Sequence, residues 1–570
     1  MSESNIIEFI DYSFQYFSQA DPTLFNIDLK IKQGEKILIV GPSGSGKSTL
    51  GHCLNGLIPS SYKGEVSGKL LIKNKIAKKQ SIFKMSKEVG TVLQDSDGQF
   101  VGLTVGEDIA FAMENDEVNT DEMKRRVREV SKMVDMDHLL GSSPFDLSGG
   151  QKQRTSLAGV LIDDVDILLF DEPLANLDPA TGKSAIEIID RIHQETNKTI
   201  IIIEHRLEDV LHCDVDRIIL IDEGRIIYDL HPHEMVSSSG LIDHGIREPL
   251  YVTALKYAGV VIDKDLKPAF IETLDYNKVK DKVVKWNQTF KDIDQTPTSD
   301  IVLSSENISF SYDGDKQVLK DINFSIHEGE MVAIVGKNGA GKSTLSKILV
   351  GFEKEDTGVV RYKGEDICDL SIKERAEVIG LVMQNPNQML SKHMIYDEVA
   401  LGLRLRGIDE IEIKDRVEKV LKVCGLDPFI EWPISVLSYG QKKRVSIAAI
   451  LVLQPKVLIL DEPTAGQDYK HYAEMMAFIE MINKTGITVI MITHDMHLML
   501  EYTSRAIVLS DGEKIADTTA ADVLSNPEVI KKANLKETSL FTLANLIGIK
   551  DPTGFIQHFI DYERREVRHI

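Results

Sequence analysis

Two glycine-rich stretches, one in each half of the chain, carry residue types that bind phosphate. They read GPSGSGKST and GKNGAGKST, and each follows a short apolar run. Glycines at this spacing let backbone N–H groups point into a loop, and a following helix adds its positive N-terminal end. We expect each loop to hold nucleotide phosphates, with its lysine on the β- and γ-phosphates and its serine on Mg²⁺. The expected binding residues are Gly41, Pro42, Ser43, Gly44, Ser45, Gly46, Lys47, Ser48 and Thr49, and Gly336, Lys337, Asn338, Gly339, Ala340, Gly341, Lys342, Ser343 and Thr344.

A pair of carboxylates follows another apolar run in each half. ILLFDEP contains Asp171 and Glu172, and LILDEP contains Asp461 and Glu462. The aspartate of each pair is placed to order Mg²⁺, and the glutamate is placed to activate a water for attack on the γ-phosphate. A bare Asp-Glu pair is more often the solvated end of a strand. The phosphate loop upstream of each pair favours catalysis here.

Two more residue types recur at matching positions. His205 and His494 each follow an apolar run directly, which suits either a catalytic contact to the γ-phosphate or a packed or capping histidine. Ser148 in LSGGQ and Ser438 in LSYGQ each begin a helix-compatible stretch. A serine and glycine at a helix start offer a hydroxyl, free N–H groups and a favourable dipole to an anion, but such a serine is also a good N-cap.

The elements that must position these residues form a repeated α/β pattern. The phosphate loop, LSGGQ, the Asp-Glu strand and the histidine return in the same order at a nearly constant offset, which predicts two copies of one domain. Strand, turn and helix alternate within each copy, so each copy should be α/β. The apolar runs that suit buried parallel strands are 36–40, 167–170 and 200–203, and 331–335, 457–460 and 487–492.

The repeat also predicts the domain boundaries. We expect a first domain at 1–240, a linker at 241–300, a second domain at 301–525 and a helical tail at 526–570. The expected linker is nearly neutral in charge and is interrupted by three prolines. The tail carries an apolar pattern that suits a helix packed on the second domain, formed by Leu540, Leu543, Leu546 and Ile547.

Composition and charge exclude several classes of protein. The 570 residues include 66 Lys and Arg against 89 Asp and Glu, which gives a net charge of −23 and disfavours binding to nucleic acid through its phosphates. No apolar run approaches the roughly 20 residues that cross a bilayer, and no secretory signal is evident at the N-terminus. The four cysteines have neither metal-ligand nor disulfide spacing. We therefore expect a soluble, intracellular, multidomain protein.

The ordered set of motifs resembles the ABC ATPases over both copies. This resemblance implies two P-loop ABC ATPase domains in tandem that bind ATP and Mg²⁺ and form an intramolecular head-to-tail sandwich. It assigns Gln94 and Gln384 to Q-loops that contribute to catalysis and Mg²⁺ binding, and Asp178 and Asp468 to D-loops. Tyr16 and Tyr312 match the adenine-stacking position, although an ordinary strand aromatic is equally compatible. The signature residues it assigns to ATP are Ser148, Gly149, Gly150, Ser438 and Gly440.

In such a sandwich each ATP contacts both copies. The first site would combine Lys47, Asp171, Glu172 and His205 with Ser438 and Gly440, and the second would combine Lys342, Asp461, Glu462 and His494 with Ser148 and Gly150. The sequence departs from the family pattern at Tyr439, which replaces the first glycine of the second signature. We predict two competent sites and leave their equality open.

Shorter segments narrow the resemblance. QDSDGQF, QNPNQM, GIREPLY and LKETSL are similar to segments of the ATPases of energy-coupling factor transporters. This resemblance implies a fused pair of such ATPases, peripheral on the cytoplasmic face of the cell membrane, that drives import of a small solute such as a vitamin or metal ion. Its implied partners are a transmembrane coupling component and a substrate-binding component, both integral to the membrane.

Two other classes of function share some of these features. Soluble tandem ABC proteins that act on ribosomes or nucleic acid also lack membrane segments, but their inter-domain arms tend to be basic and helical, unlike the segment here. The second is a scaffold protein that binds nucleotide without hydrolysing it, and the two Asp-Glu pairs disfavour this class. The transported substrate is not encoded in these motifs.

Overall fold

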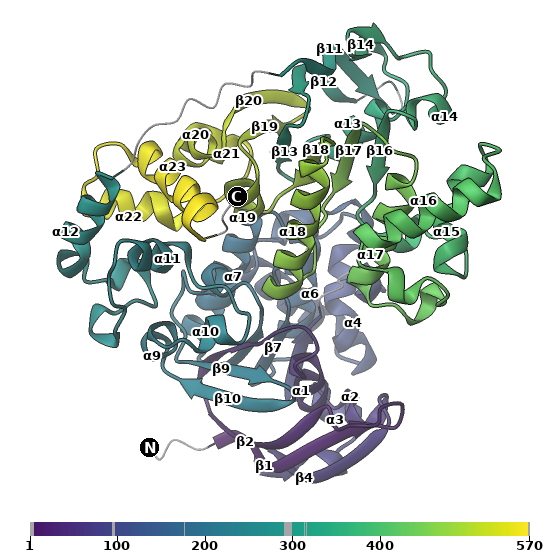
Figure 1. The fold of residues 1–570 in the computed structure, drawn as a ribbon. Helices are drawn as coiled ribbons and strands as arrows, with labels where there is room; N and C mark the ends of the chain where they lie inside the picture. Colours follow the sequence, from purple (N-terminus) through teal and green to yellow (C-terminus); the bar gives the residue numbers. More distant parts are fainter. Residues whose placement is uncertain are drawn as a thin grey trace. The chain divides into compact units, whose positions relative to one another are not determined.

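The structure, a computed structural model, describes residues 5–93, 97–175, 177–289, 299–312, 314 and 316–567. These residues divide into two compact units. The first unit extends to Gln288 and includes Asp468–Lys470, and the second comprises Thr289–Gln467 together with the chain from His471 onward. Each unit combines sheets with covering helices (Figure 1), which confirms the prediction of α/β architecture.

The first unit contains two sheets. Its strands are β1 (Asn5–Tyr16), β2 (Leu24–Lys32), β3 (Lys36–Val40), β4 (Gly64–Ile72), β5 (Lys75–Ile76), β6 (Val89–Val92), β7 (Ile167–Asp171), β8 (Thr199–Ile203), β9 (Arg217–Asp222) and β10 (Arg225–Leu230). An antiparallel sheet has the order β2-β1-β4-β5, and a larger sheet has the order β10-β9-β3-β8-β7-β6. In the larger sheet all neighbours are parallel except β9 and β10. Every residue of β3 and β8 is buried, as expected for central parallel strands covered on both faces.

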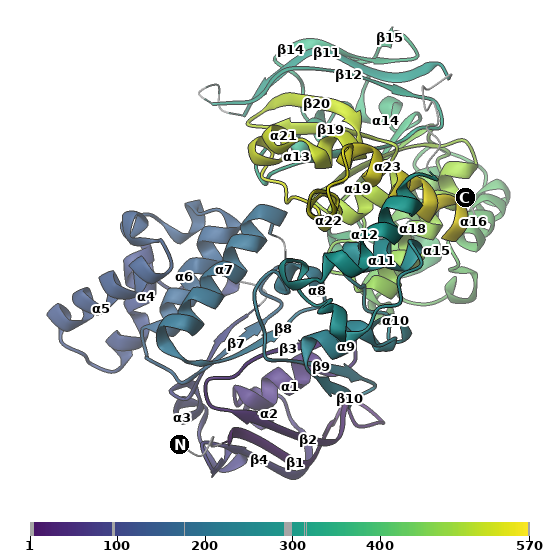
Figure 2. The same cartoon turned by 90° about the vertical axis from the view of Figure 1, so that its left-hand side faces the viewer.

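Helices of the first unit cover both sheets. They are α1 (Lys47–Leu54), α2 (Leu57–Ser60), α3 (Ile82–Ser86), α4 (Val105–Asn115), α5 (Thr120–Met133), α6 (Gly149–Leu161), α7 (Pro179–Thr196), α8 (Leu207–Val210), α9 (Pro232–Ser237), α10 (Gly240–Asp243), α11 (Leu250–Tyr257) and α12 (Tyr276–Asn287). Helices α4, α5 and α6 pack against one another at one side of the unit (Figure 2). One hydrophobic core joins the two sheets and α1, with Phe9, Ile39, Leu50 and Ile203 among its members.

The second unit repeats this plan. Its strands are β11 (Ile301–Ser311), β12 (Gln317–His327), β13 (Met331–Gly336), β14 (Thr357–Tyr362), β15 (Glu365–Asp366), β16 (Ile379–Val382), β17 (Val457–Asp461), β18 (Thr488–Thr493), β19 (Arg505–Ser510) and β20 (Glu513–Thr519). The sheet orders are β12-β11-β14-β15 and β16-β17-β18-β13-β19-β20. Its helices are α13 (Lys342–Leu349), α14 (Ile372–Arg375), α15 (Ile395–Arg404), α16 (Glu410–Val423), α17 (Tyr439–Leu451), α18 (Tyr469–Lys484), α19 (Met496–Tyr502), α20 (Ala520–Ser525), α21 (Pro527–Lys532), α22 (Ser539–Ile547) and α23 (Pro552–Tyr562).

Two segments predicted outside the domain cores are helical. The described part of 241–300 includes α11 and α12, and α12 buries Val279, Val283 and Trp286 along one face. In the tail, α22 buries Leu540, Leu543 and Ile547, whereas Leu546 is 39% exposed. The prediction that Leu546 packs with the others was wrong, because the three buried positions share one helical face and position 546 lies off it. The four-part domain division itself stays a prediction.

Candidate functional site

Strand order brings the candidate residues of each unit to one edge of a sheet. In the first unit β8 lies between β3 and β7, and Ile203 is paired with both Ile39 and Asp171. The phosphate loop leaves β3, the Asp-Glu pair ends β7 and His205 follows β8. Because these strands are parallel, their carboxyl ends meet at one edge, where open α/β sheets bind ligands. The second unit has the same order, β13-β18-β17.

The first phosphate loop is shaped for an anion. Gly46 has φ 102°, a conformation that residues with a Cβ rarely adopt, and α1 begins at the next residue, Lys47. The Lys47 Nζ donates hydrogen bonds to the carbonyl oxygens of Gly41 at 2.7 Å and Pro42 at 2.8 Å. Burial lowers the pKa of Lys47, and the Glu172 carboxylate opposes that shift. The ammonium therefore lies inside the loop, in place to contact phosphate oxygens.

The second phosphate loop has the same geometry. Gly341 has φ 98° directly before α13. The Lys342 Nζ donates to the carbonyl oxygens of Gly336 at 2.7 Å and Lys337 at 2.9 Å. Both predicted loops thus fold as anion cradles in which backbone carbonyls hold the lysine.

The Asp171 carboxylate suits a divalent cation. Its Oδ1 is buried and has no hydrogen-bond partner among the described residues. Burial raises the pKa of Asp171 to about 6, helped by the charge of Glu172, while a hydrogen bond with Ser48 acts against the rise. Burial likewise raises the pKa of Asp461, and Ser343 opposes it. A cation held between serine and aspartate would compensate this buried carboxylate, so the residues fit Mg²⁺.

Both glutamates after these aspartates have an unusual backbone conformation. Glu172 has φ 49° and Glu462 has φ 46°, in the left-handed region that non-glycine residues rarely occupy. Their N–H groups donate to the carbonyl oxygens of Ile203 and Ile492, each at 2.9 Å. Strain of this kind persists where the surrounding structure enforces it, and it concentrates at functional sites. Neither motif spacing nor composition predicts it.

The histidines have different partners in the two units. In the second unit the His494 Nδ1 lies 2.6 Å from the Glu462 Oε1, and the Thr493 hydroxyl donates to the Glu462 Oε2 at 3.3 Å. Burial works against ionisation of Glu462, yet the His494 ring holds the pKa of Glu462 below its usual range. In the first unit the His205 Nδ1 lies 3.2 Å from the Oε1 of Glu204, a residue not predicted from the sequence.

Both signature serines are N-caps. Ser148 caps α6 and Ser438 caps α17, each in a capping box with the glutamine three residues later. The hydroxyls accept from the N–H groups of Gln151 at 3.4 Å and Gln441 at 3.2 Å. The capping alternative therefore holds in this structure, and anion binding by these residues stays a prediction. Gly149, Gly150 and Gly440 lie in the first turns of the two helices.

The second signature helix is hydrogen bonded to its own Q-loop. The Tyr439 hydroxyl donates to the Gln384 carbonyl oxygen at 3.1 Å. The Lys443 Nζ donates to the same oxygen at 2.7 Å. In the first unit Gln153 occupies the position of Lys443 and donates instead to the Pro173 carbonyl. The remaining acceptors of the Lys443 Nζ are the carbonyl oxygens of Met383 at 3.0 Å, Asp461 at 3.4 Å and Glu462 at 3.4 Å.

The predicted adenine-stacking tyrosines lie beside the phosphate-loop helices. The hydroxyls of Tyr16 and Thr49 are 3.2 Å apart, and those of Tyr312 and Thr344 are 3.3 Å apart. Each ring is thus held next to the helix that begins at the phosphate loop. Stacking on adenine itself stays a prediction.

The last of the predicted residues are the two Q-loop glutamines and the two D-loop aspartates. Gln94 lies outside the described residues, and Gln384 is exposed two residues after the end of β16. Asp178 is buried and caps α7 by accepting from the Thr181 N–H at 2.9 Å. Asp468 directly precedes α18.

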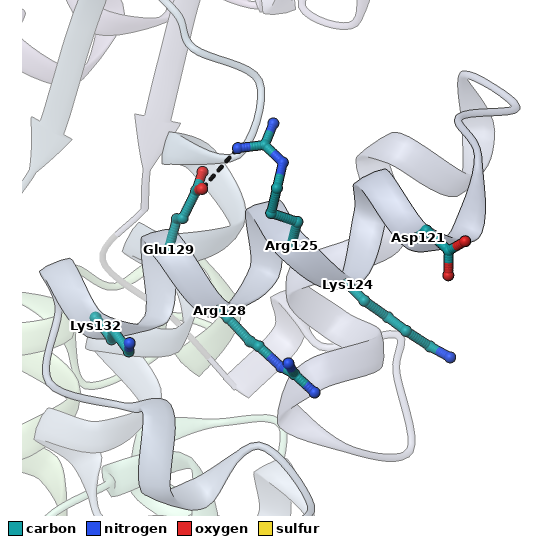
Figure 3. Close-up of a pocket in the computed structure, with 6 residues that line it drawn as sticks. All are labelled: Asp121, Lys124, Arg125, Arg128, Glu129 and Lys132. Carbon is teal, nitrogen blue, oxygen red and sulfur yellow. Dashed lines mark hydrogen bonds and ion pairs between the residues drawn. The ribbon is translucent and has the colours of Figure 1, made fainter.

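A surface groove on α5 lies apart from all of these residues. It is lined by Lys124, Arg128, Lys132 and Asp121, and by Arg125, whose Nη1 lies 2.6 Å from the Glu129 Oε1 (Figure 3). All of these side chains are charged and belong to one exposed helix face, so the groove is not the nucleotide site. Within the part of the chain that the structure describes, no helix has both the length and the apolar composition needed to cross a membrane.

Comparison with known proteins identifies the family. A family profile described as "ABC transporter" matches residues 24–175 and 319–465. An ABC transporter ATP-binding protein of Clostridium perfringens is 58% identical over 564 residues, which cover 99% of this chain and 99% of that protein. This chain belongs to the ABC transporter ATP-binding proteins. The prediction of two ABC ATPase domains in tandem is confirmed, and proteins of this family bind and hydrolyse ATP.

Other similarities add detail about this ABC transporter ATP-binding protein. A profile described as "ATP-binding cassette cobalt transporter" matches residues 238–310. A relative from Vibrio parahaemolyticus is 55% identical over 98% of this chain and 96% of its own length. A solved structure of cbiO1 from Clostridium perfringens, part of the ABC transporter complex cbiONQ, is 38% identical and covers 44% of this chain and 100% of that chain, with a TM-score of 0.39. So low a score gives no basis for extending that complex to this chain.

Two further residues of the candidate sites stand out when the two copies are aligned. Glu204 precedes His205 where Thr493 precedes His494, and Lys443 replaces Gln153 after the signature. The aligned sequences show that these positions differ. Only the structure shows that they contact a catalytic candidate or a Q-loop, because those contacts join segments distant in sequence.

Proposed function

We propose that this chain is the ATP-hydrolysing subunit that energises a membrane importer of a small solute. The observation that carries the proposal is a complete set of phosphate loop, Asp-Glu pair and histidine at one sheet edge in each unit. The cobalt-transporter description of the profile matching residues 238–310, and the segments similar to energy-coupling factor ATPases, favour a metal ion or vitamin as the solute.

The residues of the first unit have separable roles in hydrolysis. Lys47 and the loop N–H groups bind the phosphates, and Tyr16 holds the base. Ser48 and Asp171 would hold Mg²⁺, which neutralises charge on the β- and γ-phosphate oxygens when bound. Glu172 accepts a proton from the attacking water, and its enforced backbone conformation fixes where that carboxylate points.

The second unit repeats these roles with Tyr312, Lys342, Ser343, Asp461 and Glu462. His205 and His494 would contact the γ-phosphates, and Gln94 and Gln384 would complete the two Mg²⁺ sites. We infer a head-to-tail sandwich in which Ser438 and Gly440 close the first ATP site and Ser148 and Gly150 close the second. ATP would hold the two halves closed, and hydrolysis would release them.

The partners follow from this role. The chain acts at the cytoplasmic face of the cell membrane, where a transmembrane coupling component receives the closing motion and a substrate-binding component selects the solute. Extraction of membranes from cells that express the tagged chain, followed by affinity purification, tests the assignment. Co-purification of polytopic membrane proteins is expected. Recovery with ribosomes and without any membrane protein would contradict the transport role.

Catalysis is tested by removing each general base. Glu172→Gln and Glu462→Gln should each lower steady-state ATP turnover of the purified chain. The double variant should lose it by about 10²–10⁴-fold, the usual cost of a lost general base. ATP binding, measured separately, should persist because the phosphate loops are intact. A double variant with normal turnover would refute the assignment, and a single variant with unchanged turnover would refute two competent sites.

A further inference from the structure

The residue that precedes the strand-end histidine differs between the units. It is Glu204 in the first unit and Thr493 in the second. Glu204 follows β8, between the phosphate-loop strand and the Asp-Glu strand, and it is fully buried. Burying a carboxylate is costly unless hydrogen bonds compensate, so a buried glutamate at this position needs a structural reason.

The Glu204 carboxylate joins two segments that flank the active site. Its Oε1 accepts from the backbone N–H groups of His205 at 2.9 Å and Arg206 at 3.2 Å. Its Oε2 accepts from the N–H of Leu174 at 3.2 Å, in the turn directly after Glu172. The Arg206 guanidinium donates to the Leu174 carbonyl as well. The Glu204 carboxylate and the Arg206 guanidinium therefore both join the histidine turn to the turn after the catalytic glutamate, and Glu204 is the one of the two that also holds His205.

Thr493 reproduces only half of this arrangement. Its Oγ1 accepts from the Asp495 N–H at 2.9 Å, which corresponds to the bond from Arg206 to Glu204. The same hydroxyl donates to Glu462 at 3.3 Å. A threonine offers no second oxygen, and in this unit the His494 Nδ1 pairs at 2.6 Å with Glu462 itself.

We propose that Glu204 is a positioning residue of the first ATP site that holds His205 and the turn at Leu174 in place. In the second unit the catalytic carboxylate of Glu462 itself positions His494. The inference rests on the proposed catalytic roles of Glu172 and Glu462. With its Nδ1 directed to Glu204, His205 keeps Nε2 for the γ-phosphate. In the second unit Glu462 must release His494 before it accepts a proton from water.

This arrangement predicts a separation of kcat from KM. Within the described residues no hydrogen bond or ion pair joins Glu204 to the phosphate loop, and its charge is the weakest of the four carboxylate charges that act on Lys47, so its loss should leave ATP binding nearly intact. Outer-shell residues that orient a metal ligand typically contribute 10–100-fold to metal affinity or activity, and we expect a loss at the lower end of this range for a residue that orients His205. The second site lacks the equivalent carboxylate, and the two sites should therefore differ in their rate of turnover.

The test uses the full chain carrying Glu462→Gln, so that only the first site turns over. Glu204→Thr, which installs the residue of the second unit, should lower kcat roughly 10-fold with KM for ATP changed less than about threefold. Glu204→Gln keeps the shape and one acceptor and should give an intermediate kcat. If Glu204→Thr does not fold, the kcat and KM of Glu204→Gln are sufficient to test the positioning role. Glu248→Gln removes another buried carboxylate, one paired with Lys256 outside the site, and should leave kcat unchanged.

The outcomes separate the inference from the proposed function. Unchanged kcat in both Glu204 variants, or a rise in KM with kcat preserved, would overturn the positioning role. Normal turnover in the Glu172→Gln, Glu462→Gln double variant would instead overturn the catalytic assignment on which it rests. If Glu462→Gln alone stops turnover, the two sites are coupled, and the same Glu204 variants in the unmutated chain should then lower the whole rate by the same factor.

Discussion

Single buried side chains distinguish the two candidate sites. Lys443 is 1% exposed, and among the described residues its ammonium donates to four backbone carbonyl oxygens, two that directly follow β16 and two at the end of β17. Burial lowers the pKa of Lys443 to about 8, and the charges of Asp461 and Glu462 oppose the shift. The corresponding Gln153 has no charge to bury. The second unit therefore pays a desolvation cost for a cationic link between signature helix and Q-loop.

This cost makes stability depend on pH. The folded-state pKa of Lys443 is about 8, below its value of about 10.5 in the unfolded chain, so between these values the unfolded chain binds more protons. The unfolding free energy should then rise with pH, by about 2 kcal/mol between pH 7.5 and 9.5, relative to a Lys443→Gln variant that lacks the group. Thermal unfolding of both proteins at the two pH values, without nucleotide and Mg²⁺, measures this. Parallel pH dependence in the two proteins would contradict it.

At the scale of elements, the strand order of each mixed sheet assembles the site. The strand that carries the histidine lies between the strands of the phosphate loop and the Asp-Glu pair, and all three are parallel. The turn from the phosphate loop into α1 also requires a left-handed backbone conformation at Gly46. At Gly46 an added Cβ would lie 2.9 Å from the Thr23 carbonyl oxygen and from the Leu24 side chain.

Gly46→Ala should therefore damage both fold and binding. A Cβ at φ 102° should cost on the order of 1–3 kcal/mol of unfolding free energy and should displace the start of α1, which abolishes ATP binding at the first site. Thermal unfolding and equilibrium ATP binding measure the two effects. Gly141→Ala is the control, because no atom lies within 4 Å of its added Cβ and its φ is not left-handed. Equal behaviour of the two variants would contradict the conformational requirement.

At the scale of the whole molecule, charge limits the partners. A net charge of −23 repels a polyanion, whereas the proposed ATP sites are local cradles of N–H groups and lysine. The chain should show no binding to double-stranded DNA or RNA at 50 mM salt, where counterion release most favours basic proteins. A filter-binding titration that uses the same preparation as the ATPase measurement tests this. Tight, salt-sensitive binding would favour the nucleic-acid class of tandem ABC protein.

The sequence by itself determined the duplication, the α/β class, the phosphate loops and the Asp-Glu pairs, because these depend on residues close together in the chain. Strand positions agreed closely, as in β3 and β8, because runs of apolar residues are buried on both faces. The sequence did not predict that Leu546 would be exposed. Leu546 is as apolar as its buried neighbours in the helix, so residue type alone does not distinguish it from them. The tertiary structure alone decided the partners of His205 and His494, the four carbonyl oxygens around Lys443 and the left-handed backbone of both glutamates. These features join strands and turns far apart in the chain, and they are fixed only when parallel strands align their carboxyl ends at one edge of the sheet.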